Sequence, residues 1–196
     1  MAGPVGNCSL VSTIAQLPSS YDLRFPQPSS KMKQHLKDIR LGEGLGVIRF
    51  GATKDEVKQQ LGAPTETERY TLDEDDDEDE TEDWHYDELG ISLSFEQIHD
   101  WRLSSIAVSD EAYTLEDISL IGRTKADVLE EFRKRNWGTP QEDDVVADEG
   151  DSQSLYHIDE AMLSLWFEED ELTEVQWGPY MKNEEVVWPD ERTNAN

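Results

Sequence analysis

The sequence predicts an α+β protein built from two tandem repeats, each a helix packed on a small antiparallel sheet. A glycine turn that leads into a helix occurs twice, at Gly51 and at Gly122, an offset of 71 residues. Each helix is followed by alternating apolar and polar residues, a pattern typical of half-buried strands. Because four such matches occur in the same order, the sequence indicates an internal duplication.

Each predicted helix has a start signal and a stop signal. Thr53 and Thr124 follow the glycine turns as N-cap residues, and an acidic residue three positions later can complete a capping box. Both helices then run into a Gly-x-Pro stop, at residues 62–64 and 138–140. We therefore expect one short helix in each repeat.

A strand pair with the same pattern follows each helix. Residues 87–96 match residues 159–168, and a last strand at 103–108 matches 172–177. Strict alternation directs the apolar side chains toward the helices and the others to the opposite face of the sheet. The residues expected on that opposite face are His85, Ser92, Ser94, Ser105, Ala107, His157, Ser164, Trp166, Glu174 and Gln176.

These repeats divide the chain into four parts. Repeat 1 spans 42–110 and repeat 2 spans 111–180, with an N-terminal extension at 1–41 and a C-terminal tail at 181–196. The first 40 residues hold five basic and two acidic side chains, so the remaining 156 carry a charge of −31. The Pro- and Ser-rich start of the chain predicts an extended segment, with Met32 as an alternative start of the compact protein.

The composition excludes several classes of protein. With 45 Asp and Glu against 17 Lys and Arg, the formal charge is −28, which repels phosphate backbones and argues against direct nucleic-acid binding. A single cysteine, Cys8, excludes an internal disulfide framework and a cysteine-rich zinc site. No apolar stretch is long enough to span a membrane, and no cationic segment followed by an apolar one indicates export. We therefore expect a cytoplasmic protein that is monomeric when free and does not contact membranes.

No motif in the chain indicates catalysis. There is no Gly-x-Ser-x-Gly elbow, no P-loop and no dinucleotide-binding glycine motif. His85 and His157 occupy equivalent repeat positions and could approach each other, but two histidines without a third ligand make a weak metal site. The sequence thus predicts a protein that is not an enzyme and holds no cofactor or metal.

The chain resembles the tandem-repeat β-lactamase-inhibitor-protein fold over about residues 42–180. The opening motif of that fold is matched by Gly44-Leu-Gly46-Val-Ile48-Arg-Phe50-Gly51-x-Thr53-x-x-Glu56-Val57, ending in Leu61-Gly62-x-Pro64. The chain is similar in the same way to outer-membrane assembly lipoproteins and to bacterial toxin-immunity proteins. The resemblance implies that the two sheets join side by side into one open face that grips a target through aromatic residues. The chain lacks the secretion signal and the disulfides of the β-lactamase inhibitor, and it lacks the lipidated cysteine of the assembly lipoproteins. Of the three roles, the resemblance therefore leaves that of a cytoplasmic immunity protein.

The strongest sequence anomaly is an acidic segment at 73–83, where ten of eleven residues are carboxylates. We expect it in the loop between the first helix and the first strand pair, because clustered carboxylates repel one another and resist burial. The segment is either a solvated loop that aids solubility or a surface that captures a basic partner. Calcium binding is a third interpretation, but the segment lacks the glycine and the spacing of a usual calcium-binding loop. Its acidic members are Asp73, Glu74, Asp75, Asp76, Asp77, Glu78, Asp79, Glu80, Glu82 and Asp83.

Two tryptophans are candidate contacts for a partner. Trp166 is the one large apolar group on the expected open face, so it is either an interface anchor or an edge residue covered by another part of the chain. Trp101 lies in a predicted turn and is a candidate rim contact. The partner-binding set predicted from the sequence adds His85, Ser94, His157 and Gln176 to these two residues and the acidic segment.

Together these observations predict a cytoplasmic immunity protein that neutralises a basic secreted toxin, such as a nuclease, by presenting an acidic, substrate-like surface. Two alternatives remain open at this point. The protein could load a secreted effector without inhibiting it, or it could be a generic acidic binding module.

Overall fold

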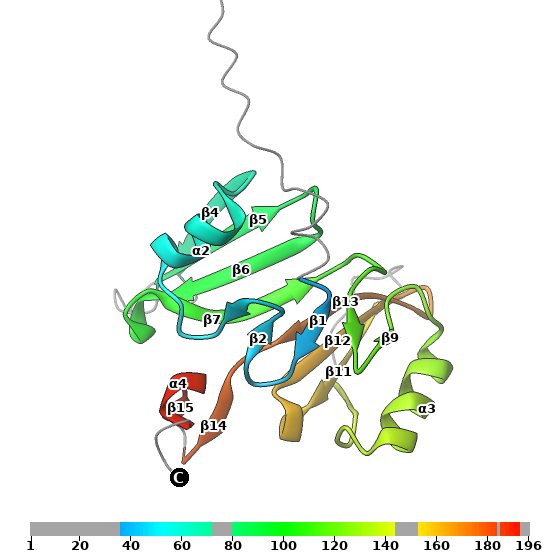
Figure 1. The fold of residues 1–196 in the computed structure, drawn as a ribbon. Helices are drawn as coiled ribbons and strands as arrows, with labels where there is room; N and C mark the ends of the chain where they lie inside the picture. The colour runs from blue at the N-terminus through cyan, green and yellow to red at the C-terminus, as the bar shows by residue number, and fades with distance from the viewer. Residues whose placement is uncertain (1–35, 72–79, 144–152, 184, 193–196) are drawn as a thin grey trace, which may run out of the picture.

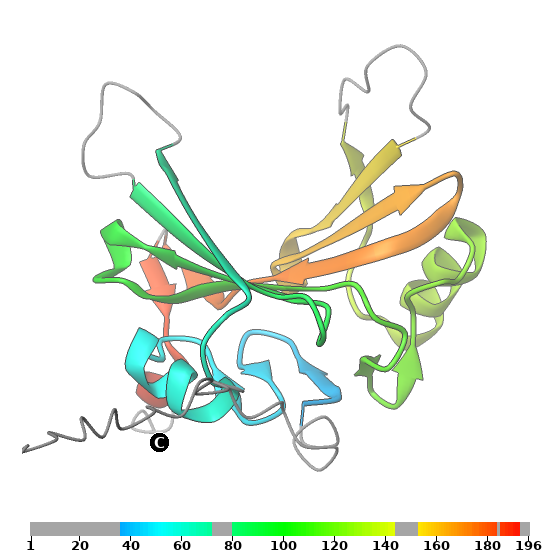
Figure 2. The same cartoon turned by 90° about the horizontal axis from the view of Figure 1, so that it is seen from above.

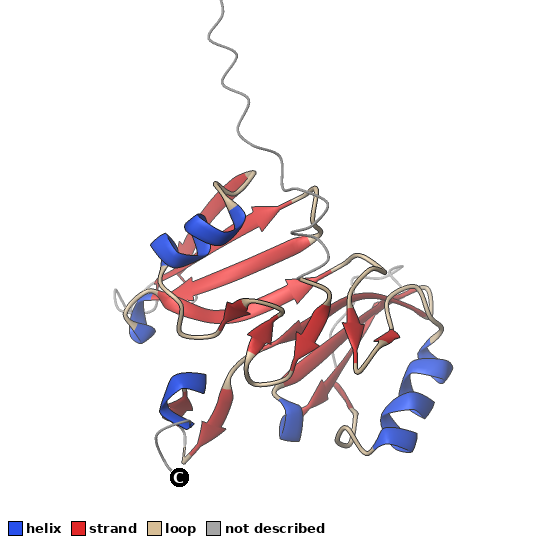
Figure 3. Cartoon of the chain, viewed as in Figure 1, coloured by secondary structure: helices blue, strands red, loops and turns tan. Residues whose placement is uncertain are grey.

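A sheet of eight antiparallel strands forms the frame of the protein, and helices lie on one side of it (Figures 1 and 3). The computed structural model describes residues 36–71, 80–143, 153–183 and 185–192. The strand order is β10-β11-β12-β13-β7-β6-β5-β4, and two smaller sheets accompany it. The predicted α+β class is therefore confirmed.

The eight strands come in two groups of four that are consecutive in sequence, which we call the first and second arms. The first arm consists of β4 (Glu66–Thr71), β5 (Glu80–Tyr86), β6 (Ile91–Glu96) and β7 (Arg102–Val108). The second arm consists of β10 (Gln141–Asp143), β11 (Gln153–Ile158), β12 (Leu163–Glu168) and β13 (Glu171–Trp177). The arms meet only where β13 pairs with β7, and the sheet bends there into a V (Figure 2).

A five-stranded sheet, in the order β3-β2-β1-β8-β9, ties the two halves of the chain together. Its strands are β1 (Asp38–Arg40), β2 (Gly44–Leu45), β3 (Ile48–Arg49), β8 (Thr114–Leu115) and β9 (Ile118–Ser119). β1 and β8 pair in parallel although they come from different halves. Leu36 and Ile39 are 0% and 5% exposed, so the segment predicted as an N-terminal extension already contributes to the core from its last residues.

The segment predicted as a C-terminal tail also carries structure. β14 (Tyr180–Lys182) and β15 (Glu185–Val187) form a hairpin, and α4 (Pro189–Arg192) follows it. The Tyr180 ring covers Gly42, where an added Cβ would lie 2.3 Å from ring carbons, and Gly42 has a φ of +65°. A side chain at position 42 would therefore both clash and strain the backbone.

The helices start where the sequence predicts, and their caps differ. α2 (Lys54–Leu61) has a complete capping box between Thr53 and Glu56. In α3 (Lys125–Arg135) the Thr124 side chain accepts from the Asp127 backbone N–H at 3.3 Å, and the Asp127 carboxylate bonds the Thr124 hydroxyl instead of its backbone N–H. Aspartate is one methylene shorter than glutamate, so the reciprocal bond is not made.

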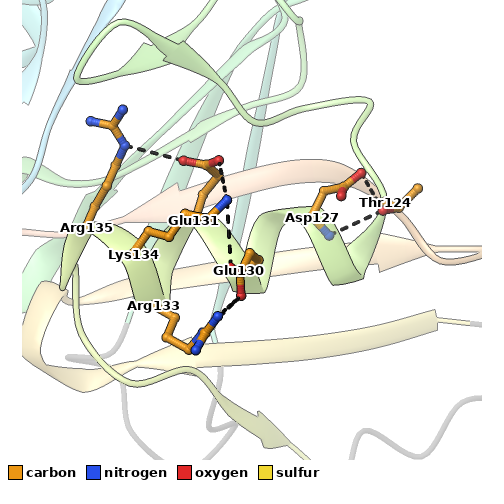
Figure 4. A network of polar contacts seen from close by, with 7 residues as sticks. All are labelled: Thr124, Asp127, Glu130, Glu131, Arg133, Lys134 and Arg135. Carbon is orange, nitrogen blue, oxygen red and sulfur yellow. Dashed lines mark hydrogen bonds and ion pairs between the residues drawn. The ribbon is translucent and has the colours of Figure 1, made fainter.

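The predicted stop of the second helix at Gly138 is wrong. α3 ends at Arg135, and Asn136 takes the left-handed conformation at the C-cap. Asparagine tolerates this conformation, and ending the helix here lets the Trp137 ring pack edge-on against Phe132, with centroids 5.3 Å apart. Along the exposed side of α3, acidic and basic side chains one turn apart form ion pairs (Figure 4).

The core lies between the sheet and the helices. The strand residues expected to point toward the helices are at most 3% exposed, namely Ile91, Leu93, Phe95, Leu163, Leu165 and Phe167. Each arm carries a β-bulge at the same place, after Ser94 in the first arm and after Trp166 in the second. The helices lie outside the V, so the face inside it is left for other contacts (Figure 2).

Candidate functional site

We call the sheet face inside the V the open face, and one row of residues crosses it through all eight strands. Each member of the row is the cross-strand partner of the next. In order from β4 to β10 the row is Glu66, His85, Ser92, Ala107, Gln176, Ser164, His157 and Gln141. Alternation along the strands therefore places His85, His157 and Gln176 where the sequence predicts them.

The two histidines have matching neighbours in the row. His85 Nδ1 lies 2.9 Å from Ser92 Oγ, and His157 Nδ1 lies 2.9 Å from Ser164 Oγ. His157 Nε2 also lies 3.0 Å from Asp143 Oδ2 at the end of β10. These contacts fix the orientation of both rings on the open face.

The two histidines do not meet. Four strands separate β5 from β11, which is roughly 24 Å along the sheet at the usual strand spacing. Among the residues that the structure describes, no three His, Cys, Asp or Glu side chains are grouped so that they could hold a metal ion.

In the first arm, a second row on the open face is wholly polar. It runs from Glu68 through Asp83 and Ser94 to Ser105, whose hydroxyl accepts from Gln176 Nε2 at 3.0 Å. The Tyr70 hydroxyl donates to Asp83 Oδ2 at 3.1 Å, while Asp83 Oδ1 is buried without a hydrogen-bond partner. Burial, followed by the charge of Asp83, raises the pKa of Tyr70 to about 12, so the phenol stays protonated.

The equivalent row in the second arm has a different character. Leu155, Trp166 and Glu174 are cross-strand neighbours there. Leu155 is only 6% exposed, and the indole Nε1 of Trp166 is buried without a hydrogen-bond partner. Burial raises the pKa of Glu174, and the charge of His85 in the first arm opposes that shift. The open face therefore holds an indole and a half-buried carboxylate side by side.

Glu82 lies on the other side of the sheet from the open face. Lys54 Nζ is 2.9 Å from Glu82 Oε2, Trp84 Nε1 donates to Glu82 Oε1 at 2.6 Å, and Arg69 bonds the same carboxylate. Although burial alone would raise it, these contacts lower the pKa of Glu82 to about 2. This carboxylate binds cations of its own chain and is turned away from any partner on the open face.

The acidic loop predicted at 73–83 is shorter than expected, because residues 80–83 belong to β5. Thr81 is buried and Asp83 points to the open face, while Glu80 and Glu82 pair with Arg69 on the helix side. Pairing of alternate carboxylates with cations makes a strand possible where like charges alone would oppose it. Asp73, Glu74, Asp75, Asp76, Asp77, Glu78 and Asp79 lie outside the described residues.

Trp101 also lies on the helix side of the sheet. Its ring packs against the core and is covered by two cations, with Lys54 Nζ 4.0 Å and Arg69 Cζ 4.9 Å from the ring centroid. The structure therefore brings Ser94, His85, His157, Trp166 and Gln176 together on one face and places Trp101 and Glu82 on the other.

Sequence reasoning missed the contribution of β4 to the open face. The signal that could have revealed this strand is its share of β-forming residues, Thr67, Tyr70 and Thr71, directly after the Gly-x-Pro stop of the first helix. All six residues of β4 are exposed, since it is an edge strand. Asp143, the partner of His157, was missed for the same reason at the opposite edge.

Comparison with known proteins identifies no family for this chain. No protein-family model matches it, and no curated protein matches it. A solved structure of an extracellular protein containing an SCP domain, from Bacillus anthracis str. Ames, is similar at 14% identity with a TM-score of 0.42. The match covers 73% of this chain and 51% of that protein, so the chain spans about half the length of the structure it matches.

The predicted resemblance to the β-lactamase-inhibitor fold is therefore wrong, and so is the assignment to the immunity proteins that rested on it. The residues that suggested it have local explanations: Gly51 and Gly62 take positive φ angles in turns, and Thr53 caps a helix. Such residues recur wherever a turn leads into a short helix. Within the described residues, no helix has the length and apolar character needed to cross a membrane.

Proposed function

We propose that this chain binds a basic protein partner on the open face and blocks the surface that it covers. The single observation that carries the proposal is the open face itself, a bent eight-stranded sheet whose inner side no described helix covers (Figure 2). Its two rows carry polar and acidic side chains together with Ala107, Leu155 and Trp166, and no Lys or Arg, where an ordinary solvent-facing surface mixes charges of both signs.

Charge supports a basic partner. The open face has no Lys or Arg in its two polar rows, while Glu66, Glu68, Asp83 and Glu174 all belong to it. The strands at both edges of the sheet border chain segments that are rich in carboxylates in the sequence, at 73–79 and 142–151. Complementary charge speeds the encounter of two proteins and selects against acidic competitors.

The near-symmetry of the face supports the duplication that the sequence predicts. We propose that the two arms derive from one repeated unit, because the His–Ser pair, the bulge and the capped helix occur once in each. On this proposal the open face arose when two sheets joined at β7 and β13. The two arms then share one backbone arrangement but present different side chains to a partner, a polar row in the first arm and a row with Trp166 and Glu174 in the second.

The test is a pull-down with tagged full-length protein at ~50 mM and ~300 mM salt, which differ in Debye screening length. The open-face variant Glu66→Gln/Glu68→Gln/Asp83→Asn is compared with Asp55→Asn/Glu169→Gln/Glu185→Gln, which removes the same charge elsewhere. We expect one basic protein to be retained by the wild type and the control, and lost from the open-face variant. The retained protein is then assayed for its own activity with and without this chain.

Two results would contradict the proposal. Equal loss of the partner from both variants would mean that net charge alone is responsible and the face is not used. A partner whose activity is unchanged when bound would remove the blocking role and leave a carrier. The toxin-neutralising role and the cytoplasmic location expected from the sequence stay predictions until that assay is done.

A further inference from the structure

The second arm holds a half-buried carboxylate, Glu174, that forms no ion pair with a described Lys or Arg, although the charge of His85 in the first arm favours its ionised form. Glu174 makes no hydrogen bond or ion pair with any described side chain, although burial raises its pKa. A carboxylate can accept several hydrogen bonds, so the Glu174 oxygens are available to a donor from a partner. In contrast, Glu82 on the helix side is contacted by Lys54, Arg69 and Trp84.

A partly buried indole, that of Trp166, lies beside this carboxylate. Trp166 and Glu174 are direct cross-strand partners on β12 and β13, so their side chains emerge next to each other on the open face. The indole N–H is buried, and it cannot pair with a cation because both are donors, so a cation could bind only over the ring face. The neighbouring Leu155 is buried apart from the main core cluster and adds an apolar edge.

A cationic side chain is the group that fits both neighbours. A guanidinium can stack on an indole while donating two parallel hydrogen bonds to one carboxylate. An ammonium is more strongly hydrated and makes a point contact, so it gains less from a half-buried site. The same chemistry is used within this chain, where Arg69 lies over Trp101 and bonds Glu82.

From this juxtaposition we infer that the open face binds an arginine side chain of its partner, stacked on Trp166 and paired with Glu174. The inference rests on the proposed function, since it names the feature of the basic partner that the second arm selects. The first arm, whose equivalent residues are Ser94 and Ser105, contributes general negative charge and no preference between arginine and lysine.

The test compares two labelled peptides, hexa-arginine and hexa-lysine, by fluorescence anisotropy with the full-length protein. We expect the arginine peptide to bind roughly tenfold more tightly, equivalent to about 1.4 kcal/mol. Glu174→Gln and Trp166→Ser should each reduce that ratio toward one. The matched control Glu68→Gln, which removes one charge from the first arm, should weaken both peptides alike and leave the ratio unchanged.

The outcomes separate this inference from the proposed function. If Glu174→Gln and Trp166→Ser left the ratio of the two peptide affinities unchanged, the arginine site would be overturned. The proposed function would not be affected, because the pull-down tests it separately. The chain's own basic segment is a rival occupant. If Arg24→Lys, which keeps the charge of that segment, raised the affinity for hexa-arginine in the full chain, Arg24 would occupy the site in place of a partner's arginine and the inference would be overturned.

Discussion

The two arms of the sheet share a framework and differ in the surfaces that they present. Each arm has a histidine Nδ1 that lies 2.9 Å from a serine Oγ, and a helix capped by threonine. Each also has a β-bulge before a buried phenylalanine, Phe95 in the first arm and Phe167 in the second. On the open face, however, Ser94 and Ser105 of the first arm correspond to Trp166 and Glu174 of the second. Core positions are constrained by packing and turn positions by backbone conformation, whereas a solvent-facing position is free to change.

The helix sides of the arms differ as well. In the first arm Lys54 lies over the Trp101 ring and reaches Glu82, forming a network with Arg69. In the second arm the equivalent Lys125 reaches Asp170 at 3.4 Å and lies over the rings of Tyr156 and Phe167. The first arm thus depends on a partly buried ion network, and the second on aromatic contacts.

The largest effect is expected where the arms are alike. Phe95 and Phe167 are 0% and 1% exposed at equivalent positions, so Phe95→Ala and Phe167→Ala should each lower the free energy of unfolding by about 3–5 kcal/mol. Urea denaturation monitored by circular dichroism measures both. If one variant lost less than half as much as the other, the arms would not be equivalent in packing.

The next effect should be confined to the first arm. Glu82→Gln should lower the free energy of unfolding by about 2 kcal/mol at pH 7, because it leaves Lys54 without its carboxylate and Arg69 with Glu80 alone. Ser154→Ala, at the equivalent place in the second arm, should change it little. The Glu82 pKa is lowered from 4.5 to about 2, so its contribution is present above pH 4.5 and is lost as the pH falls between these values.

Urea denaturation at pH 7 and at pH 3 checks the Glu82 prediction. The difference between wild type and Glu82→Gln should shrink at the lower pH. A difference that stayed constant would mean that the network acts through packing and not through charge.

A smaller effect should separate the two helix starts. Glu56→Ala removes the reciprocal bond of the capping box, which the Thr53 backbone N–H donates to the Glu56 carboxylate, and should lower the free energy of unfolding by about 1 kcal/mol, whereas Asp127→Ala breaks no bond to a backbone N–H and should lower it less. Thermal denaturation of the two variants, with Thr53→Ser as a control that retains the cap, gives the comparison. Equal losses would show that the reciprocal bond, which the Thr53 backbone N–H donates to Glu56, adds nothing.

The smallest effect has the opposite sign. Burial raises the pKa of Glu174, so the folded state holds a proton more tightly than the unfolded state. The free energy of unfolding therefore falls as the pH rises from the unfolded-state pKa through the higher folded-state pKa. Glu174→Gln should therefore increase the free energy of unfolding at pH 7 by about 0.5 kcal/mol, with little change below pH 4. Chemical denaturation at both pH values measures it, with the exposed Glu169→Gln as the control. A loss of stability at pH 7 would mean that Glu174 is paired in the folded protein.

The sequence predicted the features that depend on local patterns. Period-two alternation placed Trp166, Gln176 and both histidines on the correct face, and threonine caps marked the starts of α2 and α3. It failed where a contact distant in sequence decides the structure. Residues 80–83 form a strand because Lys54 and Arg69 neutralise Glu82, and no local rule reveals that pairing. β1 enters the core because β8, far along the chain, pairs with it.

The short joint between the arms has a consequence for the chain as a whole. Besides the pairing of β7 with β13, the halves are held by β1 against β8 and by the bridge between Gly42 and Pro179. The residues that connect the halves, 109–112, are all exposed. A protease that cut there would leave two fragments with complementary edges, and their reassembly would depend on concentration as it does for any two-chain complex. The stability of the intact chain therefore includes the advantage of holding both halves at a high effective concentration.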